Sequence, residues 1–358
     1  MTDDPYRRLA ERLDALPNGF PPTQDGTELR LLAKLFTPEE AELAAQLRLT
    51  LETPSQIATR TGNDPALLAP RLKGMARHGL IAWGRLDSGL GYGLLPFVVG
   101  IYELQVESID AELAQLFEEY YAKAFGGVLA PQPTLHRVVP VGESVGSGIE
   151  VHPYESVVQI VSRARSWGVL DCICRKQKAL IGKLCEHPID VCMALSEEPQ
   201  AFEHSTFVRP LDLEGALHTL RRAAQSGLVH SVSNTRAGAS YICNCCTCSC
   251  GIMRGIAELG IANVIARSAF VARVEDELCV GCDLCLDRCQ FGALSMDTVA
   301  HVDRARCVGC GLCIPSCPED ALIMDRRSAD EILPIPADAS EWQMQRAVAR
   351  GKTLEDVL

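Results

Sequence analysis

A cysteine repeat in the last third of the chain constrains the fold most. The segment CVGCDLCLDRCQFGALSMD, residues 279–297, recurs 28 residues later as CVGCGLCIPSCPEDALIMD, residues 307–325, with 11 of 19 positions identical. Each copy spaces its cysteines as C-x2-C-x2-C-x3-C. Three thiolates at such short intervals wrap three corners of one metal–sulfide cluster, and the fourth is displaced far enough to reach a second cluster. We therefore predict that the repeat holds metal.

This spacing resembles that of the bacterial two-cluster ferredoxins. The resemblance implies one [4Fe–4S] cluster bound by Cys279, Cys282, Cys285 and Cys317, and a second bound by Cys307, Cys310, Cys313 and Cys289. Zinc in two four-cysteine sites is the alternative. The triple run, the x3 spacing and Pro318 directly after the last cysteine disfavour it.

Glycines in the repeat fit the same interpretation. Gly281, Gly309 and Gly311 suit loops that turn tightly and approach inorganic sulfide. One departure from the family pattern is Gln290, which follows Cys289 where proline is frequent. This departure concerns the turn and leaves the ligand set intact.

Nine further cysteines precede the repeat, and the first 171 residues contain none. They are Cys172, Cys174, Cys185, Cys192, Cys243, Cys245, Cys246, Cys248 and Cys250. If the run YICNCCTCSCG is extended, its side chains alternate, so Cys243 and Cys245 share one face and the other three share the opposite face. Nine thiols suffice for one or two further [4Fe–4S] clusters with at least one thiol left over. Structural zinc and dithiol redox chemistry are the alternatives.

The surroundings of these nine cysteines support metal binding. Arg175, Lys176 and Arg254 are close in sequence and would offset the negative charge of thiolate ligands. The histidines at 187, 204, 218 and 230 are each expected to be ordinary surface or core residues. With its CxCR and CNCC segments, the chain resembles ferredoxin-type proteins of anaerobes that end in a two-cluster ferredoxin. That resemblance implies electron transfer and names no substrate.

Composition narrows the class of protein. The 17 cysteines are an odd number, which a disulfide framework would not use fully. The charged N-terminus has no signal-peptide pattern, and no apolar run approaches the roughly 20 residues of a membrane span. We therefore expect a cytoplasmic protein. The oxygen sensitivity expected of its clusters points to anaerobic or microaerobic metabolism. Its net charge of −12 disfavours binding to nucleic acid.

The cysteine-free half predicts helices and a hairpin. Helices are expected at 37–47, 53–59 and 64–78, followed by a hairpin whose tip lies at 87–89. The first has Thr37 and Glu40 as a capping box. This order resembles the winged-helix superfamily. Pro70 is expected to distort or restart the third helix, whose first half offers no donor for a base edge, so we favour a docking or structural role over DNA binding.

The remaining segments complete an α+β chain. An aromatic helix from Ile109 is expected to end at Gly126, with further helices at 154–166, 214–225 and 340–350 and a short strand at 136–141. The predicted parts are an N-terminal helical segment (1–26), a winged-helix-like domain (27–105), a helical connector (106–165), a cysteine-rich Fe–S domain (166–270), a dicluster ferredoxin domain (271–328) and a tail (329–358).

Apart from the cysteines, the sequence shows no catalytic or cofactor-binding pattern. The sequence has no P-loop, no dinucleotide fingerprint in a strand–helix context and no haem-attachment motif. We expect an electron-transfer subunit or carrier, rather than a stand-alone enzyme, that relays single electrons between partner oxidoreductases. The alternatives are a redox-sensing transcriptional regulator and a catalytic Fe–S subunit of a reductase complex. Residues 271–325 contain ten acidic and four basic side chains, which favours a partner with a basic docking surface.

Overall fold

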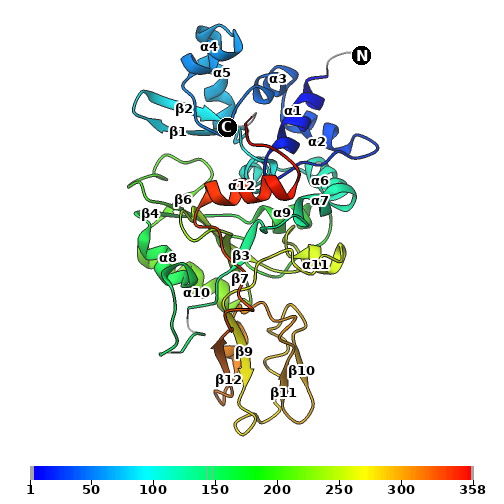
Figure 1. Cartoon of the computed structure of the whole chain (residues 1–358), viewed down its shortest axis with the longest axis vertical. Coiled ribbons are helices and arrows are strands. Elements are labelled where there is room, and N and C mark those ends of the chain that lie inside the picture. The colour runs from blue at the N-terminus through cyan, green and yellow to red at the C-terminus, as the bar shows by residue number, and fades with distance from the viewer. Residues whose placement is uncertain (1–3, 143, 147, 356–358) are drawn as a thin grey trace. The chain divides into compact units, whose positions relative to one another are not determined.

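A computed structural model describes residues 4–142, 144–146 and 148–355 (Figure 1). Contacts divide the chain into two compact units. The first contains residues up to 132, 177–183 and 343 onward, and the second contains residues 133–176 and 184–342. The finer six-part division remains a prediction. No helix in the described part of the chain is long and apolar enough to cross a membrane.

The first unit begins with the predicted series of helices and a hairpin. Helices α1 (Pro5–Ala15) and α2 (Thr27–Leu35) precede α3 (Pro38–Ala45), α4 (Pro54–Thr61) and α5 (Pro65–Arg77), and the hairpin pairs β1 (Ala82–Leu86) with β2 (Gly89–Gly93). The capping box of α3 is present, because Thr37 accepts from the Glu40 N–H and Glu40 accepts from the Thr37 N–H. The order matches the expectation, and the winged-helix assignment itself remains a prediction.

Two features of the helices differ from expectation. Pro70 lies inside α5 without interrupting it, because a single missing N–H removes one hydrogen bond and the remaining turns continue. The aromatic helix α6 (Ala111–Ala124) ends before Gly126, which begins the short helix α7 (Gly126–Leu129) instead of stopping the chain. The segment η1 (Phe97–Ile101), whose backbone is non-helical at residues 98–100, and the 3-10 helix η2 (Glu103–Gln105) precede α6.

The aromatic stripe of α6 is core, as expected. Phe117 stacks on Tyr102 with ring centroids 3.8 Å apart, and Tyr120 lies 4.8 Å from the ring of Phe20. All four side chains are buried.

A six-stranded antiparallel sheet organises the second unit. Its strands are β3 (His136–Val138), β4 (Ser166–Leu170), β5 (Cys192–Ser196), β6 (Arg209–Leu211), β7 (Val229–Ser233) and β8 (Tyr241–Cys245), in the order β3-β7-β8-β5-β4-β6. The helix expected at 154–166 is shorter than predicted. It is η3 (Pro153–Glu155) followed by α8 (Val157–Arg163), and Ser166 already begins β4.

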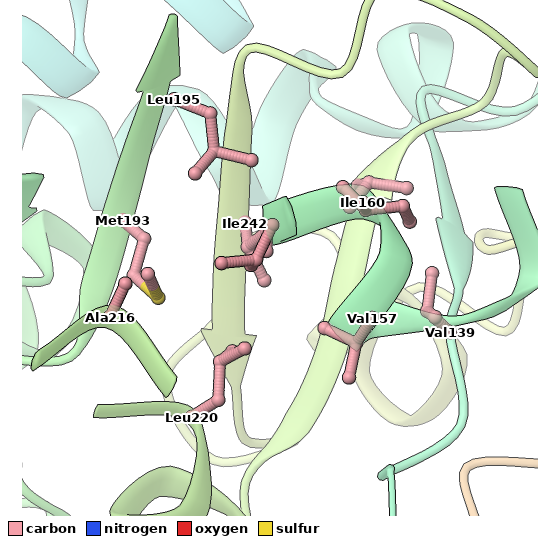
Figure 2. Close-up of a cluster of buried hydrophobic side chains, with 10 residues drawn as sticks. Val139, Val157, Ile160, Met193, Leu195, Ala216, Leu220 and Ile242 are labelled. Carbon is pink, nitrogen blue, oxygen red and sulfur yellow. The ribbon is translucent and has the colours of Figure 1, made fainter. Parts of the chain in front are cut away.

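Two helices cover one face of this sheet. α8 and α10 (Leu213–Gln225) place apolar side chains against β5, β7 and β8, and the resulting core is shown in Figure 2. Met193 and Leu195 on β5 and Ile242 on β8 point toward the helices, so their strand neighbours point to the opposite face. That opposite face carries Cys192 of β5 and Cys243 and Cys245 of β8.

Two small two-stranded antiparallel sheets accompany the repeat in the second unit. β9 (Phe270–Val274) pairs with β12 (Leu322–Arg326), and β10 (Leu294–Met296) pairs with β11 (Ala300–Val302), as Figure 1 shows. The remaining helices are α9 (Ile173–Leu180), α11 (Arg254–Glu258), η4 (Ile314–Ser316) and α12 (Ala339–Ala349). On α12, Trp342 is buried and donates from its indole nitrogen to the Thr134 carbonyl at 2.9 Å.

Candidate metal centres

The eight cysteines of the repeat gather around two separate cavities. One cavity is lined by Cys279, Cys282, Cys285 and Cys317, here called the first quartet. The other is lined by Cys289, Cys307, Cys310 and Cys313, the second quartet. The rest of each lining is largely apolar, including Met296 and Leu322 beside the first and Phe291 and Met324 beside the second. Four convergent thiols in an apolar cavity suit a cubane, which takes one thiolate at each of four irons.

Backbone amides point at the sulfurs in both copies of the repeat. The Ala293 N–H donates to Cys289 Sγ at 3.3 Å, and the equivalent Ala321 N–H donates to Cys317 Sγ at 3.3 Å. A third amide, Ala300 N–H, donates to Cys279 Sγ at 3.4 Å. Such N–H···S bonds favour the more negatively charged state of a bound cluster and so influence its potential.

Left-handed backbone conformations recur at equivalent positions of the two copies. Gly281 and Gly309 have φ values of +66° and +72°. At two other positions the copies exchange glycine for aspartate: Asp283 (φ +63°) corresponds to Gly311 (φ +74°), and Asp320 (φ +51°) to Gly292 (φ +57°). Aspartate tolerates this region better than most residues. At Gly309 a side chain would collide with the Phe270 carbonyl and the Ser268 hydroxyl, so that glycine is required.

The two loops that carry these cysteines differ in solvent exposure. Val280 and Leu284 of the first loop are 65% and 51% exposed, whereas their equivalents Val308 and Leu312 are 6% and 2% exposed. Cys282 of the first quartet is itself exposed. The first cavity therefore lies at the surface of this unit.

The second loop is held by the rest of its unit. Three backbone carbonyls of the loop accept hydrogen bonds from other segments. The Val141 N–H donates to the Cys310 carbonyl at 3.0 Å, and the Ser268 hydroxyl donates to the Gly309 carbonyl at 2.7 Å. The Arg327 guanidinium donates to the Cys307 carbonyl at 2.6 Å. The second quartet is consequently built into the unit.

Burial affects the protonation of these thiols. It raises the pKa of Cys310 to about 12, and the charges of Cys307 and Cys289 act in the same direction. Burial likewise raises the pKa of Cys285 and of Cys313. These three thiols are therefore neutral until a cation displaces their protons, which is the behaviour expected of metal ligands.

Six of the nine upstream cysteines form a closed ring, in which each thiol interacts with two others. In order around this six-thiol ring they are Cys172, Cys174, Cys250, Cys245, Cys243 and Cys192. Two hydrogen bonds from Cys174 and Cys192 lower the pKa of Cys172, and the same bonds raise the pKa of both donors. Six such thiols cannot ionise together without added positive charge.

Sheet register explains how the ring assembles. Met193 on β5 pairs with Ile242 on β8, so the next residues, Cys192 and Cys243, lie opposite each other on the face away from α8 and α10. Cys245 follows two residues later on the same face. The predicted common face of Cys243 and Cys245 is thus present.

The position of Cys250 differs from the sequence prediction. We expected it to share a face with Cys246 and Cys248, but it interacts with Cys174 and Cys245 in the ring. The reason is that β8 ends at Cys245 and a turn follows at residues 247–249, so the alternation of an extended strand does not continue.

The other three upstream cysteines lie beside a histidine. Cys185 Sγ is 3.8 Å from Cys246 Sγ, 3.5 Å from Cys248 Sγ and 3.2 Å from His187 Nδ1. All four ligand atoms lie within 4.8 Å of one another, and we call these residues the Cys3His set. The expectation that His187 is an ordinary histidine is therefore revised. The missed signal is the matched spacing of Cys185-x-His187 and Cys246-x-Cys248.

A buried arginine lies between the ring and the Cys3His set. The Arg175 guanidinium is 3% exposed, donates from Nη1 to the Asn244 carbonyl at 3.0 Å and contacts Cys246 Sγ at 3.8 Å. Its Nε and Nη2 are buried without a hydrogen-bond partner. Burial opposes its charge, but the charges of Cys172 and Cys192 on the ring and of Cys246 raise its pKa. These unused donors fit an anionic cluster bound at the thiols.

Arg254, another of the predicted basic neighbours, forms an ion pair within its own helix. It pairs with Glu258 on the next turn of α11, with Nη2 and Oε2 2.6 Å apart. Arg175 is a basic residue that the structure places against the thiols.

Gln290 connects the repeat to the upstream cysteines. Its Oε1 accepts from the Thr247 N–H at 2.7 Å, and its Nε2 donates to the Gly227 carbonyl. Thr247 lies between Cys246 and Cys248, and Gln290 directly follows Cys289 of the second quartet. The family's frequent proline would offer neither bond. The departure seen in the sequence thus has a structural role.

Comparison with known proteins identifies the repeat. Residues 278–321 match the family described as the 4Fe-4S dicluster domain, and this segment contains both quartets. Curated proteins gave no match, and neither did solved structures. The chain therefore carries a ferredoxin-type domain near its C-terminus, and it is an iron–sulfur protein.

Proposed function

We propose that this protein relays single electrons through several iron–sulfur clusters between redox partners. The observation that carries the proposal is the contrast between the two copies of the repeat: one four-cysteine cavity lies at the surface, and the other is embedded next to further thiols. An outer and an inner centre in one domain form the two ends of a short electron path. Bound [4Fe–4S] clusters would supply one-electron chemistry there.

The residues that would hold these clusters are those gathered at the two cavities. The first quartet would hold the outer cluster and the second quartet the inner one. In each, three ligands come from one copy of the repeat and the fourth from the other, namely Cys317 for the outer and Cys289 for the inner centre. The chain fixes the spacing of the two centres by this exchange of ligands.

The six-thiol ring is the proposed site of a further iron–sulfur cluster. Each of its thiols interacts with two others, and the six need positive charge to ionise together. Arg175 provides one cation with two unused donors. Gln290 supplies hydrogen bonds between the inner quartet and the segment that contains Cys245 and Cys250. These hydrogen bonds would provide a path through the protein for electron exchange between the inner cluster and the cluster at the ring.

The surface around the outer cavity suits docking of a basic partner. Leu278, Val280 and Leu284 are half or more exposed around it. Acidic residues flank them at positions 275–277, 283 and 287. A small apolar patch inside an acidic rim favours a partner with an apolar centre and a basic rim, because such complementary charges speed encounter.

The test measures iron and electron exchange in anaerobically purified full-length protein. The ferredoxin-type domain alone accounts for about eight irons per chain. The proposal expects more than this, together with reduction of a basic cytochrome at a rate that falls as salt concentration rises. Val280→Asp should slow that reaction several-fold and leave the iron content unchanged.

A matched control separates docking from a general effect of added charge. Val158 on α8 is also exposed, at 43%, but lies outside the ferredoxin-type domain, so Val158→Asp should leave the rate unchanged. Iron limited to eight per chain would remove the ring cluster. A rate indifferent both to salt and to Val280→Asp would overturn docking at the outer cavity.

A further inference from the structure

We infer that Cys185, His187, Cys246 and Cys248 bind a single zinc ion in a closed tetrahedral site. These residues come from two loops of the second unit, one preceding β5 and the other following β8. The proposal gives the nine upstream thiols two different uses: three serve a mononuclear ion, and the other six form the ring. It rests on the geometry of the Cys3His set and does not depend on electron transfer.

Distances between the ligand atoms distinguish one ion from a cluster. With zinc–sulfur bonds of about 2.3 Å and zinc–nitrogen bonds of about 2.0 Å, a tetrahedral ion holds its ligand atoms about 3.5–3.8 Å apart. The sulfur–sulfur distances of 3.5 and 3.8 Å and the sulfur–nitrogen distance of 3.2 Å lie close to this range. In a cubane each thiolate binds a different iron and points outward, so the sulfurs stand well beyond contact distance.

The two quartets provide an internal comparison. Their cysteines line cavities in the segment that matches a dicluster domain. Within residues 4–142, 144–146 and 148–355, only the Cys3His set brings three or more potential ligand atoms within 4.8 Å of one another. The same chain therefore contains wide four-thiol sites suited to a cluster and one narrow site suited to an ion.

The donor set and its local backbone also fit zinc. Three thiolates and one imidazole complete a four-coordinate structural zinc site and leave no open position for a substrate. The backbone N–H of His187 donates to Cys185 Sγ, which fixes the turn between these two ligands. Nδ1 of His187 faces the thiols, so Nε2 carries the proton when the metal is bound.

The location of the Cys3His set indicates what a bound zinc ion would do for the structure. Cys246 is buried against Val191, Ala223 and Leu228, whereas Cys248 is exposed, so the ion would fasten a surface turn to the core. That turn contains Thr247, which bonds Gln290, and it leads to Cys250 in the ring. Zinc would therefore hold in place the segment that joins the ring to the ferredoxin-type domain.

The test is metal analysis of full-length protein purified without chelators. Wild-type protein is expected to contain about one zinc per chain in addition to its iron. His187→Ala should lower zinc at least tenfold while the irons of the two quartets remain. His187→Cys should retain zinc, because a thiolate replaces the imidazole. His204→Ala, which changes an exposed histidine outside the set, should also retain it.

Cobalt provides a second measurement. Protein produced with Co²⁺ in place of zinc should show the visible absorption of a tetrahedral thiolate-rich site, and His187→Cys should shift these bands. Wild-type protein with less than one tenth of a zinc per chain would overturn the proposal. So would a His187→Ala variant that loses iron and no zinc, since the set would then be a cluster site. Neither result would alter the salt dependence of electron transfer or its response to Val280→Asp, which test the proposed function separately.

Discussion

Asp14 is one residue on which the stability of the first unit depends. Its carboxylate lies 2.6 Å from Arg350 Nη2 and 2.9 Å from Lys352 Nζ, and it accepts a hydrogen bond from the Phe20 N–H. Burial alone would raise its pKa, but the hydrogen bond from Lys352 and the charge of Arg350 outweigh that effect and lower it. The carboxylate thus ties residues near the C-terminus to the loop after α1.

This depressed pKa predicts how stability changes with pH. Asp14 binds a proton less readily in the folded than in the unfolded chain, so its contribution is complete above the unfolded pKa of about 4 and is lost as pH falls through the folded value. Asp14→Asn should lower the free energy of unfolding by roughly 1–3 kcal/mol at pH 7 and by progressively less in acid. Anaerobic thermal unfolding at several pH values measures this.

A control residue checks that the effect is local. Asp87 lies at the exposed tip of the β1–β2 hairpin, and Asp87→Asn should leave the melting temperature unchanged within error. An Asp14→Asn difference that stays constant between neutral and acidic pH would contradict the linkage argument.

At the scale of elements, α5 tests the cost of an interior proline. Pro70 is exposed and lies beyond the first turn, where its missing N–H leaves the Ala66 carbonyl without a helical donor. Pro70→Ala should raise stability by on the order of 1–2 kcal/mol, since the restored bond outweighs the greater freedom of the unfolded chain.

Pro65 offers the matched comparison within the same helix. It occupies the first helical position, where no N–H is needed, so Pro65→Ala should give no gain. Melting temperatures of the two variants decide the point. Equal changes in melting temperature for the two variants would contradict the prediction, because the effect of a proline would then not depend on its position in the helix.

Elements were predictable where the signal is local. The capping box at Thr37 and Glu40 acts within one turn, so the sequence alone locates the start of α3. The helix predicted at 214–225 likewise ends where α10 ends. The common face of Cys243 and Cys245 followed from strand alternation. Cys250 was misplaced because nothing in the run of cysteines marks the end of β8.

Contacts between distant segments were beyond the sequence. The partnership of His187 with Cys246 depends on the loops before β5 and after β8 meeting, and the ring depends on the register of those strands. The repeat is the exception, because its spacing alone groups the same eight cysteines that line the two cavities. Whether those cysteines bind clusters in these groups remains a proposal.

At the scale of the whole molecule, Gln290 predicts how the proposed centres communicate. Gln290→Ala removes the hydrogen bonds to Thr247 and Gly227. We expect electron redistribution after rapid reduction of the outer cluster to slow several-fold, with iron content unchanged, when followed by anaerobic stopped-flow absorbance. Gln225→Ala is the matched control, because that residue offers only its backbone carbonyl, to Arg288. Equal rates in both variants would place the route elsewhere.

The difference in solvent exposure between Val280 and Val308 has a consequence for how the protein's iron is lost in air. Dioxygen diffusing from solvent meets the exposed first loop, while the embedded loop is shielded by the packing of its unit. Oxidative loss of iron would then proceed in order, from the surface quartet inward. The outermost site would serve as the sacrificial one, and a briefly aerated molecule would keep its interior centre although its connection to partners is broken.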